Sequence, residues 1–505
     1  MHTNNAEVAR CSALASVATI LIYLYYQDIT LPLAGAVSTL ACITVAGLLT
    51  QKAQPLAFLT RLMIVAYALP FLTLLGYLFS QDYEWWGTPR ARLYISDHHL
   101  QARMVTVAII GMIGLLLGMR LASLVRSRAN TQSLLPSTHD QKAATLPLLP
   151  FSCLLVFAVL LSWLSAPTKD IFAAGYATVG TEARAADLNF NSAFLISYIV
   201  IILLMIDAER ERIIVRRRNK YWSVVLVSAL IVFFLQIVRG DRESLGLILG
   251  LISLYVTGPD RATWVSGKRL AWRRVRRVAV PLCVLLLVFV GLGAARGQLA
   301  EPESASLDPI ATLRSGLQQS TWTGVLLTNL SLARQDRYGA LDTLNGQTYV
   351  DYLKSLPPGV ITRALGVDRA IEPERSPGGW TSDVGSGGAH VVIVPLKNFG
   401  ATGVFLVLLG YGFVIARCES SNIPGHLWRR LLFGTVTTCS LLWFWYGDLS
   451  LARGLLAAGG LGLFHRFTAR SAPGLAGLPL GQPPGLATHS DGLLGAERAF
   501  APGRE

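Results

Sequence analysis

Long apolar stretches recur along this sequence, and each is about as long as a lipid bilayer is thick. A hydrocarbon core of about 30 Å needs roughly 20 apolar residues per helix. The sequence therefore predicts an all-α polytopic membrane protein with about twelve spans, two of them short. The predicted spans are 9–28, 31–50, 57–80, 104–122, 148–165, 191–208, 222–238, 244–258, 278–295, 399–416, 431–447 and 453–468.

The composition agrees with lipid as the solvent for most of the chain. Hydrophobic residues make up 52% of the 505 residues and charged residues 15%, against about 25% charged in typical soluble domains. The net charge of +14 reports loop orientation in such a protein, so it does not indicate a nucleic-acid partner. The cysteines show no paired spacing, and they predict neither a metal site nor a disulfide framework.

Basic residues set the predicted orientation. With the N-terminus in the cytoplasm, most Lys and Arg fall in cytoplasmic loops, which is the usual preference. The loops 81–103, 166–190, 239–243, 296–390 and 447–453 then lie on the outer face. We expect any active surface to be on that face.

The predicted topology divides the chain into four parts. Residues 1–295 hold spans one to nine, and residues 391–470 hold spans ten to twelve. Between them, 296–390 combines amphipathic segments with a Gly- and Pro-rich stretch, which predicts a large outer loop with short helices and a lid-like segment. The Pro- and Gly-rich tail 471–505 is predicted to be disordered and cytoplasmic.

A short charged loop, 239–243, separates two apolar runs. Arg239 and Arg242 are three residues apart, so they share a face of a continuing helix or bracket a turn at Gly240. In either geometry, two guanidinium groups are able to hold a phosphate or diphosphate. The alternative is a hairpin loop in which Asp241 and Glu243 neutralise the arginines.

A second group of polar residues lies in "GSGGAHVVIVPLKNFGATG", residues 385–403, before the tenth predicted span. His390 is a candidate general base because histidine titrates near neutral pH, and the alternative is a structural role at the interface. Lys397 and Asn398 add a cation and an amide nearby. Gly400 and Gly403 are predicted to allow close helix approach.

These motifs carry a family resemblance. The Arg-Gly-x-Arg loop, "YLKSLPPG" in the large loop and "KNFGATG" before a further span resemble the O-antigen repeat-unit polymerases of the Wzy type. The similarity is loose over most of the chain and closer over 230–250 and 345–405. "HVVIVPLKNFGATG" is also similar to the related O-antigen ligases, but Val391 stands where the ligases prefer a polar residue, which favours a polymerase. Such polymerases carry an acidic residue just before Asn-Phe-Gly, and residues 394–397 supply none.

The resemblance implies a GT-C-like glycosyltransferase in the bacterial inner membrane, active at the periplasmic face without a metal or another cofactor. Its implied partners are undecaprenyl-diphosphate-linked oligosaccharides, membrane lipids and a chain-length regulator protein. Arg239 and Arg242 would hold the diphosphate, whose charge grows in the transition state. His390, or a carboxylate such as Asp241 or Glu243, would take the proton from the incoming sugar hydroxyl.

The remaining candidates for sugar or phosphate contacts lie in and after the large loop. Each also fits a plain solvated loop residue. They are Arg296, Arg363, Arg375, Trp380, Lys397 and Asn398.

Two other functions fit parts of the pattern. Asp82 and Glu84 would suit a divalent cation in a metal-dependent transferase of sugars to polyprenyl phosphate, although that family has its acidic pair after the first span. Twelve spans also suit a lipid-oligosaccharide flippase or a secondary transporter. That class has polar or broken helices near the midplane, whereas the sequence here predicts unbroken apolar spans.

Overall fold

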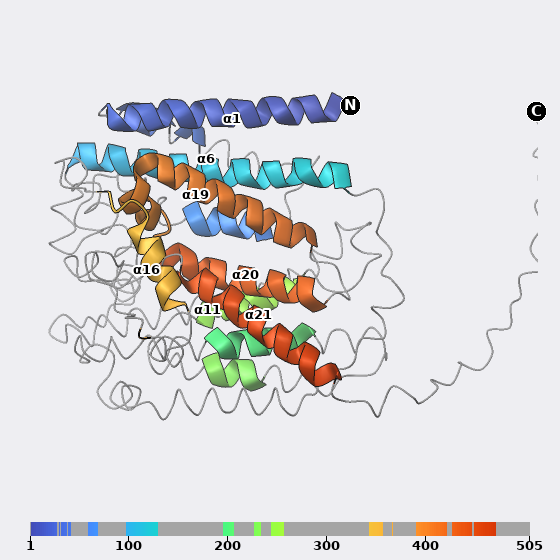
Figure 1. Cartoon of the computed structure of the whole chain (residues 1–505). Coiled ribbons are helices and arrows are strands. Elements are labelled where there is room, and N and C mark those ends of the chain that lie inside the picture. The colour runs from blue at the N-terminus through green and yellow to red at the C-terminus, as the bar shows by residue number, and fades with distance from the viewer. Residues whose placement is uncertain are drawn as a thin grey trace, which may run out of the picture.

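A computed structural model describes part of the chain, and its described residues are almost entirely helical and contain no strand. This confirms the all-α class for that part. The described residues are 2–27, 30, 32–37, 39–41, 59–68, 97–129, 195–206, 227–233, 244–256, 343–356, 366, 390–421, 427–446 and 449–470. The labelled helices in Figure 1 are α1 (His2–Tyr26), α6 (His98–Ala129), α11 (Ser244–Val256), α16 (Gln347–Ser355), α19 (Ile393–Ser421), α20 (Leu427–Tyr446) and α21 (Leu449–Arg470).

Within the described residues, three helices are long and apolar enough to cross a membrane. They are segments Glu7–Tyr26 of α1, His98–Val125 of α6 and Ile393–Ser420 of α19, and they overlap the predicted spans 9–28, 104–122 and 399–416. Shorter apolar helices lie within other predicted spans, namely Leu59–Ala68, Leu195–Ile206 and Gly246–Val256, and Ser450–Phe464 overlaps the span predicted at 453–468. The predicted spans 148–165 and 278–295 and the tail 471–505 lie outside the described residues.

Helices α6 and α19 lie side by side with their backbones in contact, because glycines line the seam. A Cβ atom at Gly114 would lie 2.5 Å from the carbonyl oxygen of Phe405, and one at Gly118 would collide with the carbonyl of Leu409. The contacts advance along both helices in the same direction, so the two run parallel. Small residues favour such close packing in membranes because backbone atoms gain dispersion contacts directly.

Helices α1 and α6 are antiparallel, and a polar contact joins them at each end. At one end, Arg120 pairs with Glu7 at 2.8 Å. At the other end, the guanidinium of Arg103 donates to the Tyr25 carbonyl at 3.4 Å and lies 4.9 Å from the centre of its ring. Each contact joins helix ends that the predicted topology places on the same side of the membrane.

Two helix ends on the predicted cytoplasmic side are capped by charged side chains from distant parts of the chain. The Glu419 carboxylate accepts from the backbone N–H groups of Leu59 and Thr60 at 2.8 and 3.0 Å. The Arg430 guanidinium donates to the Leu254 carbonyl at 3.1 Å, near the end of α11. Both contacts satisfy backbone groups that a helix end leaves without intrahelical partners.

The spans are less uniform than the sequence predicts. Helix α19 breaks at Gly400, where φ is 66° and ψ is −162°. The middle of α20 buries hydroxyl groups, and the Ser440 hydroxyl lies 3.1 Å from that of Tyr411 on α19. Such hydroxyls can bond the carbonyl one turn back, so they do not interrupt an apolar run in the sequence. The wholly buried hydroxyl residues of α20 are Thr435, Thr437, Thr438 and Ser440.

We predict that Gly118→Ala destabilises the protein by about 1–3 kcal/mol, because the added methyl group forces the α6 and α19 backbones apart. Thermal unfolding in detergent measures this as a lower midpoint temperature. The matched control is Gly410→Ala on the exposed side of α19, where a Cβ atom meets nothing within 4 Å. Equal midpoints for the two variants would contradict the assigned seam.

Candidate functional site

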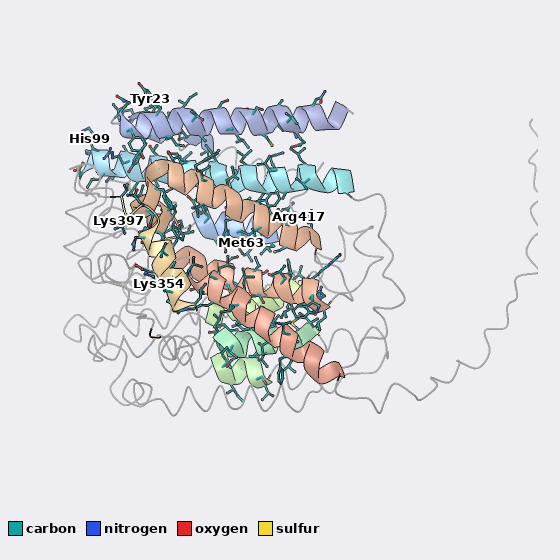
Figure 2. The ribbon with its side chains drawn as sticks, viewed as in Figure 1. Tyr23, Met63, His99, Lys354, Lys397 and Arg417 are labelled. Atoms are coloured by element: carbon teal, nitrogen blue, oxygen red, sulfur yellow. The ribbon has the colours of Figure 1, made fainter. Side chains whose placement is uncertain are left out.

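The first turns of α19 lie together with α16 at one end of the bundle, where α1 ends and α6 begins (Figure 1). Lys354 of α16, Lys397 of α19 and His99 of α6 all lie toward this end, whereas Arg417 lies toward the other (Figure 2). The predicted topology places this end on the outer face. It is therefore where a site formed by outer-loop residues and helix ends would assemble.

The break at Gly400 organises this end of the bundle. A φ of 66° is readily adopted only by glycine, and a Cβ atom there would also collide with the Tyr26 hydroxyl. The Ala401 N–H donates to the Tyr26 hydroxyl at 3.2 Å, and the Lys397 carbonyl accepts from the Leu344 N–H at 3.1 Å. Because these two groups would bond each other in a continuous helix, the break frees them to tie α1 and the segment before α16 to α19.

Asn398 caps α16 from a different helix. The N-cap position of α16 is Gly346, which has no side chain to accept a hydrogen bond. The Asn398 side-chain oxygen instead accepts from the Thr348 N–H at 3.2 Å, and its nitrogen donates to the Val394 carbonyl at 2.8 Å. The wholly buried amide thus satisfies one of the N–H groups that a helix start leaves open.

A ring contact completes the junction at 397–400. The Phe399 ring stacks on Tyr349 of α16, with centroids 5.9 Å apart and planes 11° from parallel. Every residue from Lys397 to Gly400 therefore takes part in holding α1, α16 or the segment before α16, through a carbonyl, an amide, a ring or a backbone bend. The predicted substrate contacts of Lys397 and Asn398 stay predictions beside this observed structural role.

The two glycines of "NFGATG", Gly400 and Gly403, have different structural roles. Gly400 allows close approach to α1, as the sequence predicts. A Cβ atom at Gly403 would instead lie 2.9 Å from the Pro395 carbonyl and collide with Phe399, both in its own helix. Gly403 therefore makes room for the bend within α19, and its predicted role in helix-to-helix approach stays a prediction.

His390 lies immediately before α19 and is wholly buried. Its ring packs edge-on against Tyr67, with centroids 5.1 Å apart. Burial lowers the pKa of His390 to about 3, although a hydrogen bond with the Tyr67 backbone acts in the opposite direction. The imidazole is therefore neutral at neutral pH and a weak base in this conformation. Its role in proton transfer stays a prediction.

Sequence reasoning missed Asp351 of α16, which is 7% exposed. Its carboxylate lies 3.4 Å from the Lys354 ammonium group. The available signal was the helical spacing of polar residues around it, at positions 348, 351, 352 and 355 of a segment already recognised as amphipathic.

Of the predicted site residues, the described structure brings together His390, Lys397 and Asn398 at one end of the bundle. The described residues contain no group of three His, Cys, Asp or Glu side chains placed to hold a metal ion. The other candidates lie outside the described residues: Arg239, Asp241, Arg242, Glu243, Arg296, Arg363, Arg375, Trp380, Asp82 and Glu84.

No protein-family model, curated protein or solved structure matches this chain. The family resemblance therefore rests on the quoted motifs. The structure adds a separate observation on one of those motifs, "KNFGATG": the contacts that its residues 397–401 make with α1, α16 and the segment before α16.

We predict that Asn398→Ala loosens α16, because the Thr348 N–H loses its acceptor. Losing a helix cap costs about 1 kcal/mol, so amide hydrogen exchange over residues 347–355 should speed up severalfold. Lys397→Ala is the matched control, since that residue joins the junction through its backbone carbonyl. If both variants exchange like the wild type, Asn398 does not hold α16.

His390 also predicts a pH dependence. Because its pKa is lowered in the folded state, the neutral ring stabilises folding above pH 6.5, and this contribution is lost as the pH falls toward about 3. The unfolding midpoint should therefore drop more in the wild type than in His390→Asn between about pH 7 and about pH 4. The control His99→Asn removes an exposed histidine and should keep the wild-type slope. Parallel slopes for His390→Asn and the wild type would contradict the buried, neutral assignment.

Proposed function

We propose that this protein is a metal-independent glycosyltransferase of the Wzy type, which polymerises undecaprenyl-diphosphate-linked oligosaccharide repeat units. It acts at the periplasmic face of the bacterial inner membrane through about twelve spans in a GT-C-like arrangement. The observation that carries the proposal is the junction at 397–400, a motif of the family resemblance. In the described structure this motif anchors α16, a helix of the predicted outer loop, onto the ends of membrane helices.

The location suits the chemistry of a lipid-linked substrate. A polyprenyl diphosphate has its chain in the bilayer and its reactive glycosidic bond at the interface, so the catalytic groups belong at the end of the helix bundle. A fixed α16 also suits catalysis, since positioned groups lower the barrier without first being ordered.

The proposed reaction moves one glycosyl chain between two carriers. The acceptor sugar hydroxyl attacks the anomeric carbon of the donor, a new C–O bond forms, and the bond from that carbon to the diphosphate oxygen breaks. The electron pair leaves with the diphosphate, whose growing charge Arg239 and Arg242 stabilise. The hydroxyl proton goes to a basic residue, for which His390, Asp241 and Glu243 are the sequence-based candidates.

Transport of the lipid-linked oligosaccharide is the second candidate function. The break in α19 and the buried hydroxyls in the middle of α20 favour it, because transporters use discontinuous helices and polar groups within the membrane. The break lies near the outer end of the predicted span rather than at its centre, which suits a site at the interface better. Ligation of the finished polysaccharide to lipid A is the other alternative within the resembling families.

A deletion strain distinguishes these functions through the surface polysaccharide and the lipid carrier. Loss of a polymerase leaves one repeat unit on lipid A. A missing ligase leaves none there, and polymerised chains remain on the carrier. Loss of a transporter also leaves none, but single units collect on the carrier at the inner face. If the deletion strain kept long polysaccharide chains of unchanged length, the polymerase, ligase and transporter assignments would all be wrong.

We predict that Arg239→Ala or Arg242→Ala abolishes long-chain polysaccharide while single repeat units accumulate on the carrier, because the leaving diphosphate loses a cation. Electrophoresis of the surface polysaccharide measures chain length. Arg429→Ala is the matched control, since Arg429 is exposed at the start of α20, at the opposite end of the bundle. A wild-type length distribution in both arginine variants would show that neither residue holds the diphosphate.

A further inference from the structure

Helix α16 has its polar face inward and its apolar face outward. Val350 and Leu353, on neighbouring turns, are 46% and 66% exposed. A surface helix in water normally buries its apolar side, so this orientation is reversed. An apolar outer face is expected where a helix borders lipid, as at the membrane interface. The residues on the buried face are Thr348, Asp351, Tyr352 and Ser355.

The direction of α16 also differs from that of the candidate spans. Helix α16 crosses the direction of α6 and α19 instead of running along it (Figure 1). Its 9 residues are too few to cross a bilayer, which needs roughly 20. The helix therefore lies across the end of the bundle, in the orientation of a helix that rests in the surface of a membrane.

The depth of α16 is set by its contacts with the candidate spans. Asn398 caps α16 from within the apolar stretch Ile393–Ser420 of α19. The Tyr26 hydroxyl, at the end of the apolar stretch of α1, accepts from the Ala401 N–H of the same helix α19. Helix α16 is therefore attached at the level where the apolar stretch of α1 ends and that of α19 begins. In a membrane, this level is the boundary between hydrocarbon and headgroups.

Exposed aromatic side chains connect α1 to α16 at this level. Tyr23 and Tyr26 are exposed on α1, and a spanning α1 would place them against lipid, where tyrosines form an interfacial belt. Phe399 lies two residues before the Ala401 N–H that Tyr26 accepts from, and its side chain is 45% exposed. The Phe399 ring in turn stacks on Tyr349 of α16. The exposed face of α16 thus continues the lipid-facing surface of α1.

We infer that α16 rests in the bilayer surface, where acyl chains of phospholipids cover Val350 and Leu353. Lys354 follows at the edge of this face, with half of its side chain exposed. Its apolar stem can lie along the face while its ammonium group reaches the lipid phosphates. Only the spanning of α1 and α19 is needed for this placement, which therefore goes beyond the proposed function and does not depend on it.

A photochemical cross-link tests what covers the exposed face of α16. The full chain is placed in nanodiscs of phosphatidylethanolamine and phosphatidylglycerol, with the photoreactive p-benzoylphenylalanine in place of Leu353. Illumination joins this side chain to neighbouring C–H groups, and mass spectrometry identifies the partner. The positive control carries the same group in place of Tyr23 of α1, which is exposed. We expect phospholipid adducts at both positions.

Two results of this experiment would overturn the inference. One is the absence of a phospholipid adduct at position 353 while position 23 forms one, because the face would then border water. The other is a cross-link from position 353 to another segment of the chain, which would show that protein covers the face.

A second measurement works without a cross-linker. Leu353→Glu places a carboxylate on the exposed face, which is costly against acyl chains and harmless in water. Amide hydrogen exchange over residues 347–355 in the same nanodiscs should therefore speed up by about 10-fold or more. The matched control Leu353→Met keeps an apolar side chain and should exchange like the wild type. If Leu353→Glu exchanges no faster than Leu353→Met, lipid does not cover this face.

Discussion

At Gly400 the backbone of α19 leaves helical geometry, and in a membrane the groups released by such a break must find partners, because an unsatisfied one costs several kcal/mol. Here the partners come from two other parts of the chain, Tyr26 at the end of α1 and Leu344 before α16. One backbone conformation thus connects the N-terminal helix, the predicted outer loop and the tenth predicted span. These two hydrogen bonds hold α1 and the segment before α16 against α19 at this end of the bundle.

The location of the helices could be predicted from the lengths of the apolar runs. The spans predicted at 9–28, 104–122 and 399–416 correspond to α1, α6 and α19. The start of α19 could not be predicted in this way, because the helix begins at Ile393, six residues before the start of the span predicted at 399–416. Lys397 and Asn398 look like the end of an apolar run, yet the Asn398 amide is satisfied inside the protein and therefore costs little to bury.

The residues of the candidate site could be predicted from the sequence, but their roles could be predicted only in part. His390 and Asn398 stand out in a glycine-rich, polar stretch, but the partner of Asn398 is 50 residues away, and no local pattern reveals it. The burial that makes His390 a weak base comes from Tyr67 and its neighbours, which are equally remote in sequence. The burial of Asp351 could not be predicted, because it depends on which side of α16 faces inward. Amphipathic spacing alone suggests that the opposite, apolar side is buried.

The glycine-lined contact between α6 and α19 also bears on the proposed function, in which a lipid-linked substrate has to reach the bundle. With carbonyl and amide atoms of one helix against glycines of the other, the seam has no width for a prenyl chain. Its residues also cannot separate by rotating side chains, because backbone atoms form the contact. In the proposed function, a prenyl-linked substrate therefore cannot enter along this line, and its chain would have to enter between other helices.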